Sequence, residues 1–145
     1  MSEAIESAAI EQQLRDAIHR LRTGNLASEA DVKQAVIVPI LRALGWNTDD
    51  NEQLKTEHRV ATGSVDYALF RYDQPNVFIE AKRKGKAEDP ASRKQLFDYA
   101  PNRDIPILVL TDGKLWEFYF GIGPGTWEER CFHRLTLDDD ESLPS

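Results

Sequence analysis

The chain has 145 residues, 41% of them apolar, and a formal net charge of −7. These values favour one domain with a hydrophobic core and argue against a nonspecific nucleic-acid coat. The sequence has no run of about 20 apolar residues, the length that a membrane-spanning helix needs. The N-terminus lacks a basic-then-apolar signal pattern. The one cysteine, Cys131, excludes an internal disulfide framework and is typical of the reducing cytoplasm, where we expect this protein.

Two helices are predicted in the N-terminal third. Apolar residues recur at helical spacing over 10–21, and Gly24 follows as a stop signal. The second helix begins at Ser28, where the sequence has a capping-box pattern, and Gly45 ends it. Pro39 lies inside this helix and is expected to kink it.

A strand-rich segment follows the helices. Apolar and β-branched residues predict three strands, a helix that begins at Pro90 with Asp89 as its N-cap and runs to about Ala100, and then further strands. The predicted strands cover residues 54–60, 65–70, 77–82, 105–110, 115–120 and 129–135. Two helices, three strands, one helix and further strands in this order predict an α/β fold. We expect a mixed β-sheet flanked by helices, with a helical crossover after the third strand.

The second and third predicted strands form a hairpin with a five-residue loop centred on Asp73. Pairing apolar with apolar side chains places Tyr67 opposite Ile79 and Leu69 opposite Val77. This register is a hypothesis, because a shift of one residue would send every side chain to the other face.

The same register places Asp66 opposite Glu80, and Lys82 shares the Glu80 face of its strand. Directly opposed residues have Cβ atoms about 4.5–5.5 Å apart, and two carboxylates this close repel unless a positive charge lies between them. Carboxylate oxygens bind hard divalent cations, and a lysine can orient water or offset charge on a phosphate. The three residues are therefore candidates for the site of a metal-dependent phosphodiesterase.

Four segments in this order are similar to a known family. They are Ser64–Leu69 (Ser-Val-Asp-Tyr-Ala-Leu), Phe78–Lys82 (Phe-Ile-Glu-Ala-Lys), Gln95–Tyr99 (Gln-Leu-Phe-Asp-Tyr) and Leu110–Trp116 (Leu-Thr-Asp-Gly-Lys-Leu-Trp). Together they resemble the PD-(D/E)xK nuclease superfamily, and most of all the N-terminal nuclease domain of type I restriction enzyme R subunits. The resemblance covers about residues 28–120.

The resemblance implies that Asp66 and Glu80 are metal ligands, that Lys82 is the catalytic lysine, and that Mg²⁺ or Mn²⁺ is the cofactor. The implied activity is a metal-dependent endodeoxyribonuclease acting on DNA, in defence against foreign DNA. A single restriction-endonuclease-like domain is then expected over residues 1–137, followed by an acidic, flexible tail over 138–145.

Three further residues acquire roles by the same resemblance. Gln95 and Tyr99 match a Q-x-x-x-Y motif and are four residues apart on one helix face, so both are candidate catalytic residues near the site or the DNA backbone. Glu29 matches an acid that such families often place near the metal. Each also has a structural explanation: Gln95 as a surface residue, Tyr99 as core, and Glu29 as an acid favoured in the first turn of a helix.

The resemblance also bears on partners. Type I R subunits continue into an ATP-driven motor, but this chain has no G-x-x-x-x-G-K-[ST] motif, so translocation is not expected of this polypeptide. One site cuts one strand, which makes a homodimer, or a restriction-system or helicase partner, a further expectation. Two alternatives stay open: a catalytically silent nucleic-acid-binding or partner subunit, and a nuclease for RNA or for branched or single-stranded DNA.

Overall fold

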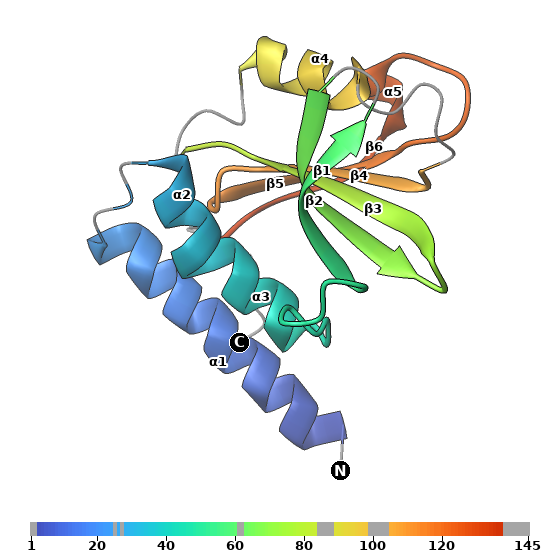
Figure 1. The fold of residues 1–145 in the computed structure, drawn as a ribbon. Coiled ribbons are helices and arrows are strands. Elements are labelled where there is room, and N and C mark those ends of the chain that lie inside the picture. The colour runs from blue at the N-terminus through green and yellow to red at the C-terminus, as the bar shows by residue number, and fades with distance from the viewer. Residues whose placement is uncertain are drawn as a thin grey trace.

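The computed structural model describes residues 3–24, 26, 28–60, 63–83, 89–98 and 105–137. Within these residues a six-stranded sheet in the order β1-β2-β3-β4-β5-β6 forms the centre of the molecule (Figure 1). The pair β3–β4 is parallel and the other neighbouring pairs are antiparallel, which confirms the expected mixed sheet. The strands are β1 Leu54–Val60, β2 Gly63–Arg71, β3 Gln74–Ala81, β4 Ile107–Thr111, β5 Leu115–Phe120 and β6 Cys131–Thr136.

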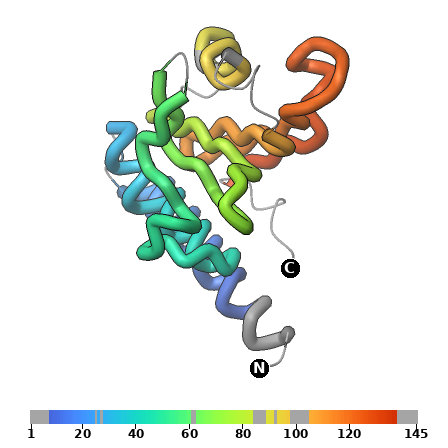
Figure 2. Tube along the Cα trace, turned by 45° about the vertical axis from the view of Figure 1, so that its right-hand side comes forward, coloured from blue at the N-terminus to red at the C-terminus, as the bar shows by residue number. Residues whose placement is uncertain are grey.

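Helices cover both faces of this sheet. The N-terminal helices lie against one face and α4 lies across the other, as the two views of Figures 1 and 2 show. The helical segments are α1 Glu3–Thr23, α2 Glu29–Val32, the π-helical η1 Lys33–Ile37, α3 Val38–Ala43, α4 Pro90–Asp98 and α5 Trp127–Arg130. The helix α4 connects β3 to β4, so the predicted crossover after the third strand is present. None of the described helices is long and apolar enough to span a membrane.

The alternation of side chains along β2 and β3 divides the core into two clusters. Tyr67, Leu69 and Ile79 pack with α1 and the α2–η1–α3 segment. Ala68 and Phe78 face the other way and pack in the cluster that includes Leu96 of α4. This division is the one that period-two patterning predicts for a sheet with helices on both sides.

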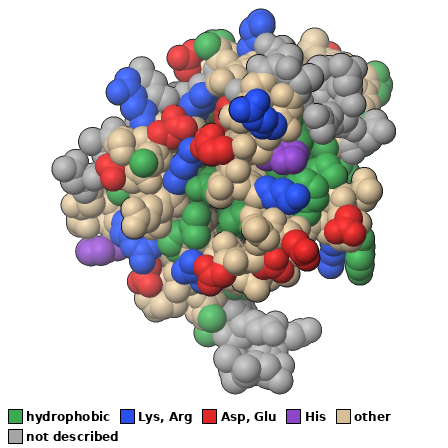
Figure 3. All heavy atoms as spheres, viewed as in Figure 1, with side chains coloured by type: hydrophobic (Ala, Val, Ile, Leu, Met, Phe, Trp, Pro, Cys, Tyr) green, Lys and Arg blue, Asp and Glu red, His purple; other side chains and the backbone are tan. Residues whose placement is uncertain are grey.

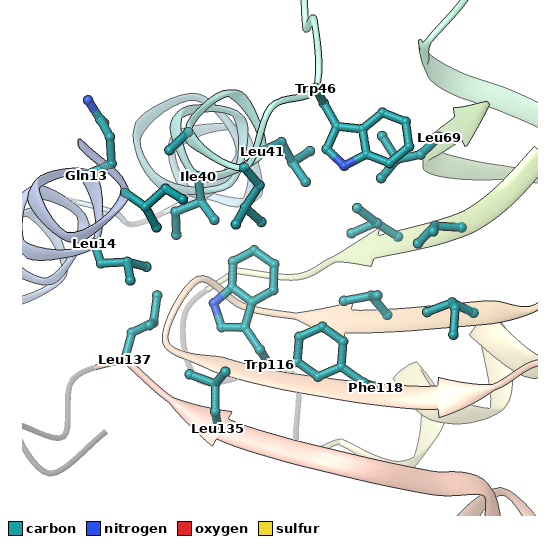
Figure 4. Close-up of a pocket in the computed structure, with 17 residues that line it drawn as sticks. Gln13, Leu14, Ile40, Leu41, Trp46, Leu69, Trp116, Phe118, Leu135 and Leu137 are labelled. Carbon is teal, nitrogen blue, oxygen red and sulfur yellow. The ribbon is translucent and has the colours of Figure 1, made fainter. Parts of the chain in front are cut away.

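An apolar cavity of about 360 Å³ lies between the N-terminal helices and the sheet. Figure 4 shows the side chains that surround it, which come from α1, α3, the segment after α3, and several strands of the sheet. Trp116 and Phe118 of β5 form one wall, and Leu41 and Trp46 form part of the opposite one. The cavity belongs to the first of the two core clusters.

The β2–β3 hairpin has the predicted register but a shorter turn. Tyr67 pairs with Ile79 and Leu69 with Val77, as expected, and the register shifts between Leu69 and Phe70. Beyond that β-bulge the strands continue to a two-residue turn, Tyr72-Asp73, whose φ angles of 53° and 63° are those of a type I′ turn. The five-residue loop is therefore wrong, because the bulge absorbs one residue and lets the ladder extend.

The second helix shows how the fold accommodates Pro39. Ser28 and Asp31 form the predicted capping box, and the helix ends before Gly45, whose φ is 104°. The helical irregularity next to Pro39 is the π-helical segment η1, which ends at Ile37. Proline has no N–H to donate to the carbonyl of Ala35, and that carbonyl instead accepts a 2.8 Å hydrogen bond from the Arg20 guanidinium of α1.

The C-terminal part differs from the expectation in one respect. The predicted strand over 129–135 begins later, at Cys131, because Glu129 and Arg130 belong to α5. Thr126 caps this helical turn and forms a capping box with Glu129. The T-x-x-E pattern at 126–129 is the sequence signal for this helix. The end of the third predicted helix, at Ala100, and the tail over 138–145 lie outside the described residues.

The contact of Arg20 with Ala35 generates a stability prediction. We expect Arg20→Met to lower the free energy of unfolding by about 1–2 kcal/mol, because it leaves a partly buried carbonyl without its donor. In a Pro39→Ala background residue 39 regains an N–H that can reach Ala35, so the same change is expected to cost less than half as much. Urea denaturation of the wild type, the two single variants and the double variant measures both costs. Equal costs in the two backgrounds would show that Arg20 stabilises the fold in some other way.

Candidate active site

The carboxylates of Asp66 and Glu80 lie together at one end of the β2–β3 hairpin. The backbone pairing of the two strands stops at Tyr67 and Ile79, and next to this pair the two acidic side chains bond to backbone of the opposite strand. The N–H of Ala81 donates to Asp66 Oδ2 at 2.8 Å, and the N–H of Asp66 donates to Glu80 Oε1 at 3.3 Å. The structure thus brings the two predicted acids together at one rim of the sheet.

Burial and proximity give the two acids opposite proton affinities. Asp66 is 8% exposed and Glu80 is 4% exposed. Burial, and then the hydrogen bond with Asp66 and its negative charge, raise the pKa of Glu80 to about 9. For Asp66, burial opposes ionisation, but hydrogen bonds from Glu80, Lys33 and the Ala81 backbone hold its pKa below the ordinary value. At neutral pH the pair therefore shares one proton, which Glu80 carries.

Lys33 of η1 is a third member of this site that sequence reasoning missed. Its Nζ lies 2.6 Å from Asp66 Oδ1 and 3.5 Å from the nearest oxygens of both Glu29 and Glu57. Burial lowers the pKa of Lys33, but the hydrogen bond and charge of Asp66, with the neighbouring glutamates, outweigh this and leave it raised. Glu29, a predicted metal ligand, is thus connected to Asp66 through the Lys33 ammonium.

Of these two additional residues, Lys33 has a partial sequence signal and Glu57 has none. Lys33 follows Glu29 by four positions on one helix, which predicts their ion pair but not the contact with Asp66. Glu57 has no local sequence signal, because its approach depends on the pairing of β1 with β2. The register is unshifted from Thr56 opposite Tyr67 to His58 opposite Val65, which places Glu57 across from Asp66, and the φ of Glu57 is 47°.

Lys82 and Gln95 meet beside the acidic pair. The backbone N–H of Lys82 donates to the Thr111 carbonyl at 2.8 Å, which fixes the chain just after β3. Its Nζ donates to Gln95 Oε1 of α4 at 2.7 Å, and its positive charge acts to lower the pKa of Glu80. The helix α4 begins at Pro90 as predicted. Asp89 accepts a 3.0 Å hydrogen bond from the Ala91 N–H.

Tyr99, the second member of the predicted Q-x-x-x-Y motif, lies outside the described residues. Arg83, which directly follows Lys82, is exposed. The geometry of this site therefore concerns Asp66, Glu80, Lys82, Gln95 and Glu29 among the predicted residues.

A second ionic cluster anchors α4 against the sheet. Glu117 of β5 is completely buried and accepts two hydrogen bonds from Arg93, at 3.1 and 3.0 Å, and one from the Tyr119 hydroxyl at 3.0 Å. Arg134 of β6 also pairs with Glu117, and Arg93 lies over the Trp127 ring. Burial opposes the ionisation of Glu117, but the hydrogen bonds from Arg93 and Tyr119 and the charges of Arg93 and Arg134 together outweigh it and lower its pKa. Arg93 is two residues from Gln95, so this cluster fixes the helix that carries Gln95.

The donor set of the site suits a hard divalent cation. No group of three or more Asp, Glu, His or Cys side chains within the described ranges surrounds a common point. Mg²⁺, however, keeps several waters and is commonly bound by one or two carboxylates together with substrate phosphate. Asp66 and Glu80 supply two adjacent carboxylates, and the Lys33 ammonium already occupies a cationic position against Asp66. The residues present therefore fit a Mg²⁺-type ion.

Comparison with known proteins gives one family match and similar solved structures. Residues 52–122 match the family described as "Type I restriction enzyme R protein N terminus". Among solved structures, the DrdV–DNA complex determined by cryo-electron microscopy matches with a TM-score of 0.59 and 15% identity, over 93% of this chain and 13% of that one. The type IIG restriction endonuclease BpuSI matches with a TM-score of 0.48 and 13% identity, over 86% of this chain and 12% of that one. No curated protein matches the sequence.

The matched segment contains β2 to β5, α4 and all of β1, and so includes Asp66, Glu80, Lys82 and Gln95. Lys33 and Glu29 lie before it. The chain spans about an eighth of the length of each of the two solved structures and shares the fold expected from the sequence. Over residues 52–122, within a restriction-endonuclease-like fold, this chain resembles the N terminus of type I restriction enzyme R proteins.

Proposed function

We propose that this chain is a metal-dependent endodeoxyribonuclease of the PD-(D/E)xK type, with Mg²⁺ or Mn²⁺ as its cofactor. The observation that carries the proposal is the meeting of two buried carboxylates, Asp66 and Glu80, at the rim of the sheet beside Lys82. Burying two acids side by side is costly and gives the fold no packing advantage. A cation site explains why they are together.

The family match and a structural neighbour support DNA as the substrate. The matched family is that of a restriction enzyme N terminus, and the solved structure with the same fold is a DNA complex. The net charge of −7 does not oppose this, because acidic and basic side chains are interspersed on the face shown in Figure 3. DNA would be held by local basic groups such as Lys82 and the exposed Arg83 rather than by the overall charge.

Each side chain then has a distinct task. A bound Mg²⁺ or Mn²⁺ ion supplies polarisation of the phosphate and a lowered pKa of coordinated water. Asp66 and Glu80 hold the ion through their oxygens, and Glu80 must give up its proton to do so. Lys82, oriented by Gln95, donates a hydrogen bond to the attacking water or to the charge that develops on phosphate. Glu29 is the proposed third acid, and Tyr99 is proposed to act with Gln95.

The proposal extends to the assembly. A single site cuts one strand, so double-strand cleavage requires a homodimer or two binding events. A restriction-system or helicase partner would supply the motor for which this sequence has no nucleotide-binding motif. Defence against foreign DNA is the corresponding biological role.

A catalytically silent binding or partner subunit is the second candidate. The observation that favours it is the ion pair of Lys33 with Asp66, because this ammonium neutralises the acid most needed for a metal. The two candidates differ in one measurable property, which is cleavage in the presence of a divalent metal.

The first prediction from this proposed function concerns cleavage by a variant without Glu80. We expect Glu80→Gln to reduce metal-dependent cleavage of plasmid and linear DNA by at least roughly a hundredfold, because an amide is a poor ligand for a hard cation. The assay uses Mg²⁺, Mn²⁺ and EDTA, with Glu52→Gln as a control at an exposed position. Cleavage that persists in EDTA, or a Glu80 variant as active as the wild type, would remove this site as the catalyst. Inactivity of the wild type on every DNA would favour the silent subunit.

The second prediction separates catalysis from metal binding. Lys82→Met is expected to reduce cleavage by about a hundredfold or more while Mn²⁺ binding, measured by isothermal titration calorimetry, is retained or slightly tighter. Removing a neighbouring positive charge cannot weaken a cation site by electrostatics. Gln95→Leu is the matched variant, expected to lower the rate less because Lys82 keeps its charge. Loss of Mn²⁺ binding in Lys82→Met would show that Lys82 maintains the structure of the metal site and is not specific to catalysis.

The third prediction concerns pH. Glu80 has a pKa of about 9 in the folded chain against 4.5 ordinarily, so the folded state binds one more proton than the unfolded state between these values. The stability contributed by this group is complete below about pH 4.5 and is lost as pH rises toward 9, by up to about 1.4 kcal/mol per pH unit. Without metal, we expect Glu80→Gln to gain stability relative to the wild type across this range in urea denaturation at pH 5, 7 and 9. Parallel stability profiles would mean that Glu80 is ionised in the folded protein.

A further inference from the structure

The Lys33 ammonium contacts the Asp66 oxygen through which a metal ion would bind. Asp66 Oδ2 is engaged with the N–H of Ala81 at 2.8 Å, an interaction that the backbone geometry of β2 and β3 holds in place. The other oxygen, Oδ1, lies 2.6 Å from Lys33 Nζ. A cation that binds Asp66 through Oδ1 therefore competes with Lys33 for the same position.

Lys33 has alternative partners when it leaves Asp66. Its Nζ lies 3.5 Å from Glu29, four residues earlier on the same helix, and 3.5 Å from Glu57 of β1. The side chains of Glu29 and Glu57 are 43% and 66% exposed, whereas that of Asp66 is 10% exposed. The ammonium can thus move outward along its flexible four-carbon stem and remain paired with carboxylates.

We propose that Lys33 is the resident counter-ion of the acidic site and that a divalent cation binds by displacing its ammonium from Asp66. This inference rests on the proposed metal-dependent function and adds a control element to it. In the metal-free protein Lys33 neutralises a buried carboxylate. In the metal-bound protein its ammonium pairs with Glu57, which leaves Glu29 available as the proposed third acid. Lys33 is a positioning residue, and its effect is on metal affinity and not on the chemical step.

The test is the affinity of the full chain for Mn²⁺ alone, measured by isothermal titration calorimetry. We expect Lys33→Met to lower the Kd by about tenfold or more, equivalent to about 1.4 kcal/mol, because the metal no longer competes with an ammonium. Lys33→Arg keeps the charge and is expected to bind like the wild type. Lys55→Met is the matched control, since Lys55 is a lysine on β1 whose Nζ lies over the Phe70 ring. A Kd for Lys33→Met equal to or higher than that of the wild type would overturn the inference.

A measurement on the unaltered protein covers the case in which Lys33→Met does not fold. Lysine side-chain nitrogen resonances, followed by NMR during a Mg²⁺ titration, are expected to shift for Lys33 and to stay unchanged for Lys55. A Lys33 resonance that does not respond while Mg²⁺ binds would overturn the displacement.

The outcomes also distinguish failure of this inference from failure of the proposed metal-dependent function on which it rests. Mn²⁺ binding by the wild type that Glu80→Gln abolishes, with Lys33→Met unchanged, would leave the metal site standing and reject only the role of Lys33. Absence of Mn²⁺ binding by the wild type and by Lys33→Met would reject both.

Discussion

The site depends on the pairing of β2 with β3 at the open end of their hairpin. There two side-chain carboxylates, in place of backbone carbonyls, accept the hydrogen bonds of backbone N–H groups. Asp66 accepts the hydrogen bond of a backbone N–H of β3, and Glu80 accepts one from β2. Both acids are almost completely buried, and each accepts a hydrogen bond from the backbone of the opposite strand. A buried acid that loses its partners costs several kcal/mol, which ties the position of the site to the pairing of these strands.

Two ionic clusters hold the helices on opposite faces of the sheet. Lys33 links η1 to β2 through Asp66, and Arg93 links α4 to β5 through the buried Glu117. Lys82 and Gln95 connect the region near the first cluster with the helix fixed by the second. The site is therefore supported from both sides, and its polar groups come from elements far apart in the sequence.

Local patterns in the sequence predict a large part of this fold. Apolar alternation predicts the β2–β3 register correctly because one face of each strand meets the α1–α3 side and the other meets α4, so a slip would exchange the two cores. Caps at Ser28 and Asp89 locate helix starts for the same local reason. Because the register follows from apolar alternation, the proximity of Asp66 and Glu80 is also predictable from the sequence alone.

The remaining features depend on contacts between distant segments. Lys33 reaches Asp66 across 33 positions, and Arg93 reaches Glu117 across 24, and nothing in either local sequence marks these pairs. The positive φ of Glu57 and the β-bulge between Leu69 and Phe70 depend on how the strands twist against their neighbours. Period-two patterning assumes a regular ladder, so the hairpin loop predicted from it has the wrong length.

The bulge between Leu69 and Phe70 has a consequence for how this hairpin can vary. On the site side of the bulge the ladder keeps Tyr67 opposite Ile79, and on the tip side the pairing is offset by one residue. The offset is absorbed before the chain reaches the tip, so the length and composition of the tip are decoupled from the spacing of the acids. The exposed Tyr72-Asp73 turn is thus a position where loops of other lengths can be inserted. Such an insertion leaves the geometry around Asp66 unchanged.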